Sequence, residues 1–172
     1  MFLNKIKDFW TKKIVKKRLS NVKLLNSSSS IKKVGIVFDE SYFYEKEALI
    51  KELVNEGIKE SDIDIIVFKN KIKKNEIFDY SVFSYRNMSW NATIDFPEFN
   101  KFIVADFDLL ISYYDVEKVP LLLTTNLSKA NFKVGFASID KRLNHFMIDT
   151  NAENYKVFME ELFKYLKILN KL

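Results

Sequence analysis

The chain has 172 residues, 48% of them hydrophobic and 15% aromatic, so it can form one domain with a substantial core. It contains no cysteine, which excludes a disulfide framework, a thiolate metal site and a cysteine nucleophile. The sequence has no run of about 18 apolar residues that would predict a membrane-spanning helix. The charged N-terminus also lacks the apolar core of a secretory signal, so we expect a cytoplasmic protein.

Positive charge is concentrated at the N-terminus. Residues 1–33 carry ten basic side chains and one acidic one, whereas the other 18 basic and 22 acidic residues leave residues 34–172 with a formal charge of −4. A basic arm joined to a mildly acidic domain predicts an anionic partner for the arm.

The arm is predicted to be an amphipathic helix over residues 2–25. We assign residues 1–26 to this basic helix, 27–32 to a serine-rich linker and 33–172 to an α/β domain. The predicted apolar docking face of the helix comprises Phe2, Leu3, Ile6, Phe9 and Trp10. The predicted anion-binding residues are Lys5, Lys12, Lys13, Lys16, Lys17, Arg18 and Lys23.

Two kinds of anionic surface suit such a helix. A lysine-dense helix gains affinity for RNA when counterions are released. It gains affinity for anionic lipid headgroups when apolar side chains enter the interface. We expect ribosomal RNA or a ribonucleoprotein first and the inner membrane face second. The plain alternative is a helix that lies on the domain with its lysines in water.

The domain is predicted to begin with a strand–helix–strand unit. Residues 34–38 form an apolar run typical of a buried strand, Ser41 is a plausible N-cap, and Gly57 stands where a helix would end. The β-branched residues of 61–68 favour a second strand. Such a unit closes with a right-handed crossover onto a parallel sheet.

The remaining elements alternate in the same way. Thr150 and Glu153 form a potential capping box before the last helix. This alternation predicts an α/β fold: a three-layer, Rossmann-like sheet of about five mainly parallel strands with helices on both faces, plus the N-terminal basic helix. The expected segments are a short strand at 80–85, a helix from 97 to about 105, a strand at 107–114, a helix at 119–130 and strands at 132–137 and 145–150.

The usual signatures of cofactor and metal sites are missing. The three glycines, Gly35, Gly57 and Gly135, lie far apart, which excludes a P-loop and a dinucleotide fingerprint. The single histidine, His145, cannot build a histidine-based metal site and is expected to be structural. We therefore expect no metal and no cofactor.

A site in such a fold would lie beyond the carboxyl ends of the strands. The crevice there is predicted to contain Asp39, Ser41, Ser112 and Tyr114. Asp39 and Asp115 are the candidate carboxylates for general acid–base work. The alternative is that these residues are ordinary polar groups of loops and caps.

Two resemblances accompany these patterns. The chain resembles an uncharacterised family of short proteins from flavobacteria and their relatives, through MFLNKIKDFW, KKVGIVFDE, FDLLISYY, NLSKANFKVGFA and FKYLKILNKL. Residues 107–136 are also similar to a segment in the N-terminal domain of heptosyltransferase-type glycosyltransferases, where a "D-L-x-I" strand, an aliphatic helix and an "x-V-G-F" strand follow in order. The second resemblance implies a shared fold. It argues against shared catalysis, because the nucleotide-sugar domain and a glycine-rich loop have no counterpart.

These observations favour a non-enzymatic accessory or binding protein, in which the basic helix docks on an anionic surface and the α/β domain binds a protein partner. The alternative is a small enzyme that acts on a sugar or another polar metabolite. A third hypothesis is a structural subunit whose partner covers the apolar face of residues 2–14.

Overall fold

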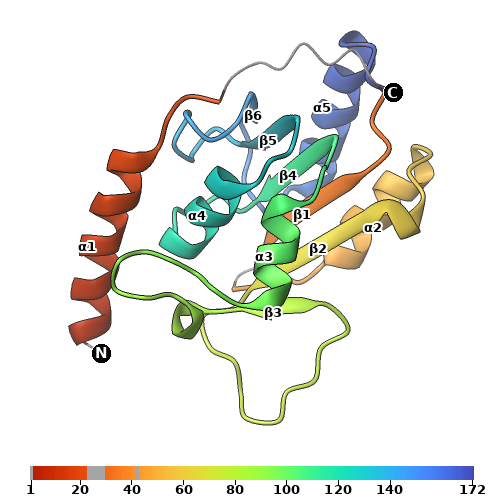
Figure 1. The fold of residues 1–172 in the computed structure, drawn as a ribbon. Helices are drawn as coiled ribbons and strands as arrows, with labels where there is room; N and C mark the ends of the chain where they lie inside the picture. Colours follow the sequence, from red (N-terminus) through yellow and green to blue (C-terminus); the bar gives the residue numbers. More distant parts are fainter. Residues whose placement is uncertain (1, 23–29, 42) are drawn as a thin grey trace.

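The fold is built on a single parallel sheet (Figure 1). The structure is a computed structural model that describes residues 2–22, 30–41 and 43–172, and for residues 2–8 the backbone alone. Six strands lie in the order β3-β2-β1-β4-β5-β6, and every neighbouring pair is parallel. They are β1 (Val34–Asp39), β2 (Ile63–Phe68), β3 (Ser81–Phe83), β4 (Leu109–Tyr113), β5 (Phe132–Phe136) and β6 (Phe146–Ile148).

This order is that of a doubly wound sheet, in which the strand sequence reverses between β1 and β4. Every residue of β1, β4 and β5 is buried, which explains why these strands are near-continuous apolar runs and not alternating patterns. The predicted α/β class is confirmed. The sheet has one strand more than the five expected, and all six are parallel.

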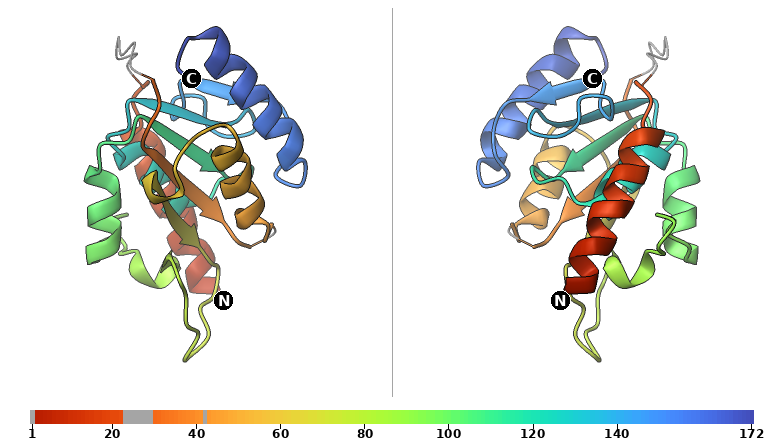
Figure 2. Two further views of the ribbon diagram at one scale, coloured as in Figure 1. Left: turned by 90° about the vertical axis from the view of Figure 1, so that its right-hand side faces the viewer. Right: turned by 90° about the vertical axis from the view of Figure 1, so that its left-hand side faces the viewer.

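The helices cover both faces of the sheet, so the domain has three layers (Figure 2). One layer contains α1 (Phe2–Arg18), α3 (Pro97–Val104) and α4 (Val119–Leu127). The opposite layer contains α2 (Lys46–Asn55) and α5 (Tyr155–Ile168).

An aromatic cluster fills the core on the α5 side of the sheet. The ring of Tyr113 lies 5.7 Å from that of Phe38, 5.1 Å from that of Phe136 and 5.2 Å from that of Phe158. All four side chains are buried. Many of the chain's 16 phenylalanines therefore serve packing, as the composition suggested.

Of the predicted helix-end signals, the glycine that ends α2 is confirmed, whereas the two predicted N-terminal caps are wrong. Gly57 has φ 97°, and the Gly57 and Ile58 amides donate to Val54 and Leu53, which closes α2 in a Schellman motif. Ser41 is not an N-cap: its amide donates to Asp39 Oδ1, and α2 begins only at Lys46.

The proposed capping box at Thr150 and Glu153 is also wrong. Helix α5 starts at Tyr155, after Asn154, and no side chain caps it. The Thr150 amide instead donates to the carbonyl oxygen of Ile148, so the chain is still turning away from β6 at that position.

Helix α1 ends at Arg18, earlier than the predicted residue 25. The guanidinium of Arg142 donates from Nη1 to the carbonyl oxygens of Lys16 and Leu19, at 3.1 and 3.4 Å, and so satisfies the last turn. The amide of Val22 then donates to the Arg142 carbonyl oxygen, which directs the chain away from the helix axis. Residues 23–25 lie outside the described part of the chain.

Candidate functional site

Helix α1 packs on α4 through a row of small and branched side chains. Thr11, Val15 and Leu19 follow one another at intervals of four residues and are 0%, 1% and 7% exposed. This row differs from the apolar stripe that the sequence shows, and Ile14 packs partly buried beside it. The helix therefore docks on the domain with one face and keeps another for solvent.

Two of the predicted anion-binding lysines are turned toward the domain. Lys12 Nζ lies 2.9 Å and Lys16 Nζ 2.8 Å from Glu117 Oε2, and Lys16 Nζ is also 3.9 Å from Asp140. Burial acts to raise the pKa of Glu117, but the hydrogen bonds from Lys16 and Lys12 hold that pKa below its usual value. These two ammonium groups therefore share one carboxylate of the domain.

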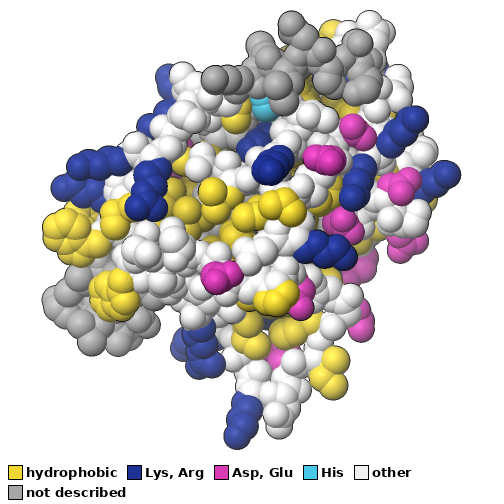
Figure 3. All heavy atoms as spheres, in the orientation of Figure 1, with side chains coloured by type: hydrophobic (Ala, Val, Ile, Leu, Met, Phe, Trp, Pro, Cys, Tyr) yellow, Lys and Arg dark blue, Asp and Glu magenta, His cyan; other side chains and the backbone are white. Residues whose placement is uncertain are grey.

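The opposite face of α1 is exposed and mixed in character. Phe9 is 67% and Trp10 54% exposed, and their rings meet edge to face at 6.1 Å. Lys13 and Lys17 are exposed, and Lys13 Nζ lies 5.7 Å from the Trp10 ring. We call Phe9, Trp10, Lys13 and Lys17 the outer face of α1. Figure 3 shows basic and hydrophobic side chains side by side along the edge where α1 runs.

The other predicted residues of the arm are only partly described. Arg18 is exposed, and its Nη1 donates to the Asn91 carbonyl oxygen at 3.4 Å. The side chains of Phe2, Leu3, Lys5 and Ile6, and the whole of Lys23, lie outside the described residues.

At the carboxyl edge of the sheet, Asp39 pairs with Lys118, which was not among the predicted site residues. Lys118 Nζ lies 2.6 Å from Asp39 Oδ2, and the two side chains are 8% and 5% exposed. Asp39 Oδ1 accepts from the Ser41 amide. Both oxygens of this candidate catalytic carboxylate are therefore occupied.

Asp115 holds a different part of the molecule. Its Oδ2 accepts from the Ala152 amide at 2.9 Å, and its carbonyl oxygen accepts from Ser138 Oγ at 2.8 Å. Tyr113 donates its hydroxyl to the Ala152 carbonyl oxygen at 2.6 Å. Asp115 thus ties the segments after β5 and β6 to the end of β4, whereas Asp39 binds Lys118.

The remaining crevice residues lie beneath α4. Ser112 Oγ is 3.0 Å and the Tyr114 hydroxyl 2.7 Å from Thr125 Oγ1. Burial raises the pKa of Tyr114, which is 1% exposed. Ser112 and Tyr114 are thus both hydrogen-bonded to Thr125. Asp39 and Ser41 form a separate pair, in which the Ser41 amide donates to the Asp39 side chain.

The residues described above fall almost entirely within the part of the chain that matches a known family. A family described as a family of unknown function (DUF6913) matches residues 7–169, from α1 to the end of α5. The chain belongs to that family. Comparisons with curated proteins and with solved structures gave no match. Because the match starts within α1, both the row that docks on α4 and the outer face of α1 lie inside the family's span.

A second charged cluster stands beside Asp39 and also went unrecognised in the sequence. The buried carboxylate of Glu40 lies 3.4 Å from Lys46 Nζ, 3.3 Å from Lys69 Nζ and 3.0 Å from the Tyr80 hydroxyl. Lys69 also pairs with Glu76 at 2.6 Å. The cluster fixes both ends of the segment between β2 and β3.

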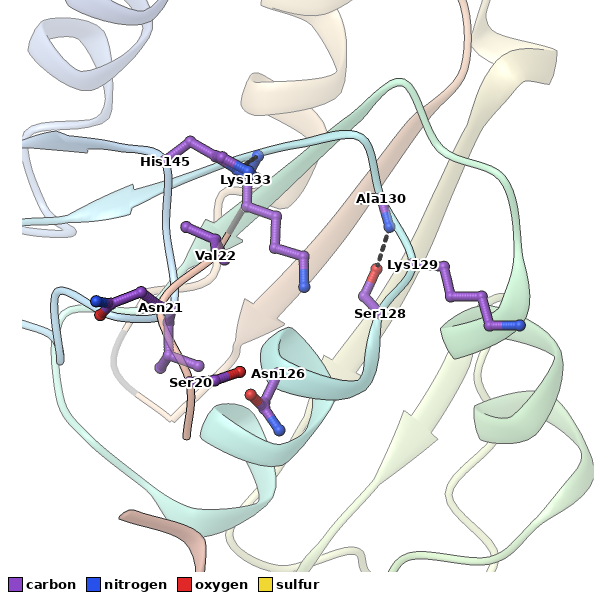
Figure 4. A pocket seen from close by; sticks show the side chains of 10 residues that line it. Ser20, Asn21, Val22, Asn126, Ser128, Lys129, Ala130, Lys133 and His145 are labelled. Atoms are coloured by element: carbon purple, nitrogen blue, oxygen red, sulfur yellow. Dashed lines mark hydrogen bonds between the residues drawn. The ribbon is translucent and has the colours of Figure 1, made fainter. Parts of the chain in front are cut away.

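A cavity of about 280 Å³ opens where α4 ends (Figure 4). Lys133 points into it and donates to the Thr125 carbonyl oxygen at 2.7 Å, capping the last turn of α4. Burial lowers the pKa of Lys133 to about 8. His145, which also lines the cavity, accepts the Lys133 amide on Nδ1, so the histidine has a structural hydrogen bond.

In the described part of the chain no three acidic or histidine side chains are placed to hold a metal ion. None of the helices described there is long and apolar enough to cross a membrane. The outer face of α1 combines exposed aromatic and basic side chains on one helix.

Proposed function

We propose that the chain is an accessory protein that docks on an anionic membrane surface through the outer face of α1, at the cytoplasmic side, and leaves the α/β domain to bind a protein partner. The observation that supports this proposal is the exposure of Phe9 and Trp10 on the same helix face as Lys13 and Lys17. On a helix that lies on a bilayer, aromatic side chains enter the interface, and lysines on the same face can extend their aliphatic stems so that the ammonium groups stay at headgroup level.

The magnitudes favour lipid over RNA. Burying the exposed parts of two aromatic rings is worth roughly 5 kcal/mol at about 25 cal/mol per Å². Each lysine near an anionic bilayer adds about 1 kcal/mol. RNA could use the same two rings only where unpaired bases stack on them, for about 1–3 kcal/mol per base. Its phosphates would meet a helix whose Lys12 and Lys16 are already paired with Glu117. The aromatic contribution is therefore the larger one, and the expected association is reversible.

The test is co-sedimentation of the full-length protein with phosphatidylcholine vesicles, with and without phosphatidylglycerol. We expect binding to the anionic vesicles, a loss of most of it in Phe9→Ser/Trp10→Ser, and a smaller loss in Lys13→Gln/Lys17→Gln. Ile168→Ser is the matched control for the aromatic pair, because Ile168 is 64% exposed on α5, in the opposite layer. Lys51→Gln on α2 is the control for charge.

RNA is the competing outcome. Binding to ribosomal RNA that depends on Lys13 and Lys17 but not on Phe9 and Trp10, with no vesicle binding, would overturn the membrane proposal. The flavobacterial distribution and the kinship with glycosyltransferases stay predictions from the sequence.

A further inference from the structure

A second exposed tryptophan lies on a short loop beside α1. The loop spans residues 88–94, and Trp90 is 59% exposed. The neighbours that anchor the loop, Met88, Ala92 and Ile94, are only 2%, 2% and 6% exposed. An antiparallel bridge joins Met88 to Ile94 at the base of the loop. The apolar residues of the loop thus point inward, with Trp90 as the exception.

Polar contacts within the loop fix its shape. The Ser89 amide donates to the Thr93 carbonyl oxygen at 2.9 Å, and the Thr93 amide donates to Ser89 Oγ at 3.1 Å. The two hydroxyls lie 2.7 Å apart. Ala92 has φ 57°, a left-handed conformation that a non-glycine residue keeps only where its surroundings impose it. Trp90 is therefore presented by an ordered loop.

The loop and α1 share one side of the molecule. Arg18 Nη1 donates to the Asn91 carbonyl oxygen at 3.4 Å, so the residue next to Trp90 contacts the end of the helix. Figures 1 and 2 both show the segment between β3 and α3 passing beside α1. Arg86, at the start of this segment, is also exposed.

Both tryptophans of the chain are more than half exposed, Trp10 at 54% and Trp90 at 59%. The core of the domain, in contrast, is built largely from phenylalanine and aliphatic side chains. Exposed apolar side chains that gather on one surface and are rimmed by polar residues mark an interaction site. Tryptophan in particular suits the boundary between apolar and aqueous phases.

We infer that Trp90 is a second aromatic anchor on the same anionic bilayer surface that α1 contacts, with Arg18 and Arg86 beside it at headgroup level. This inference rests on the function proposed above and extends it: the docking surface comprises a helix face and a separate loop. A second anchor away from the helix also restricts how far the domain can tilt on the bilayer.

Because the chain has only two tryptophans, each anchor can be observed alone. In Trp10→Phe, the emission of Trp90 reports on the loop; in Trp90→Phe, that of Trp10 reports on α1. The probes are mixed phosphatidylcholine–phosphatidylglycerol vesicles containing brominated lipid. We expect a blue shift and quenching in both variants. Trp90→Ser should weaken vesicle binding about 70-fold, from the apolar area it removes, while Ile168→Ser leaves binding unchanged.

The outcomes separate the two proposals. If Trp10 emission shifts and Trp90 emission does not, the loop stays in water: the inference is wrong and the function of α1 stands. If neither shifts, both proposals fail together. If Trp90 emission responds to ribosomal RNA but not to vesicles, the loop belongs to a nucleic-acid surface and the bilayer assignment is overturned.

Discussion

Lys118 Nζ lies 2.6 Å from Asp39 Oδ2 at the point where the strand order of the sheet reverses, and the pair is almost completely buried. Two consequences follow. The carboxylate that the sequence offered as a catalytic group has a fixed ionic partner. The polar residues at this edge of the sheet also depend on one another for stability.

Lys118→Met should therefore lower the free energy of unfolding by about 3 kcal/mol, because it leaves a buried carboxylate without its cation. The double variant Asp39→Asn/Lys118→Met should recover much of that loss. Urea unfolding measures both. Lys164→Met removes an exposed pair with Glu161 and should cost less than about 0.5 kcal/mol. Equal losses in Lys118→Met and Lys164→Met would contradict the role given to burial.

Lys133 makes stability depend on pH in the alkaline range. Burial lowers its pKa to about 8 from the ordinary lysine value of 10.5, so between these pH values the unfolded chain binds more protons than the folded one. Stability from this group should rise as the pH increases from about 8 to 10.5. Lys133→Met should remove that rise. Unfolding curves recorded across this range test the difference, and identical slopes in the two proteins would refute it.

Asp140 should contribute stability that is lost in acid. The hydrogen bonds from Arg142 hold its pKa at about 2, below the ordinary aspartate value of 3.8. The contribution is complete above about pH 4 and disappears as the pH falls through 2, a loss of roughly 2 kcal/mol. In Asp140→Asn the acid transition should become correspondingly shallower. Far-ultraviolet circular dichroism during acid titration follows it.

Gly135 is required by the side chain that lies above it. A Cβ at this position would come 2.5 Å from Asn144 Nδ2, so Gly135→Ala should cost about 2 kcal/mol in thermal unfolding. Combining it with Asn144→Ala should restore stability, since Asn144 has no hydrogen-bond partner for its side-chain atoms. Gly57→Ala is the comparison: its Cβ would meet nothing, and the expected cost of about 1 kcal/mol comes from φ 97° alone. A double variant as unstable as Gly135→Ala would show that the close contact is not the cause.

The sequence predicted the structure correctly where the signal lay within a single strand or helix. The apolar runs at 34–38 and 107–114 predicted buried parallel strands, and Gly57 predicted the end of a helix. Local cap signals failed at Ser41 and Thr150, because each residue's amide is bound within a turn that precedes the helix.

The candidate site was harder to predict because it depends on distant partners. Nothing local shows that Lys118 reaches Asp39, 79 residues away, or that Lys133 is buried against α4. The stripe containing Phe9 and Trp10 was visible in the sequence. A periodic pattern cannot tell which of two rows on a helix meets the domain, and here the row of Thr11, Val15 and Leu19 does so.

The docking of α1 on α4 has a consequence for the order in which the chain acquires its structure. Lys16 and Glu117, which join the two helices, are 101 residues apart, so α1 leaves the ribosome long before its binding surface exists. Contacts of such long range form late. The N-terminal segment therefore has no α4 to pack on until most of the sheet has been synthesised. During that interval Lys12 and Lys16 lack Glu117, the carboxylate that pairs with both of them in the folded protein.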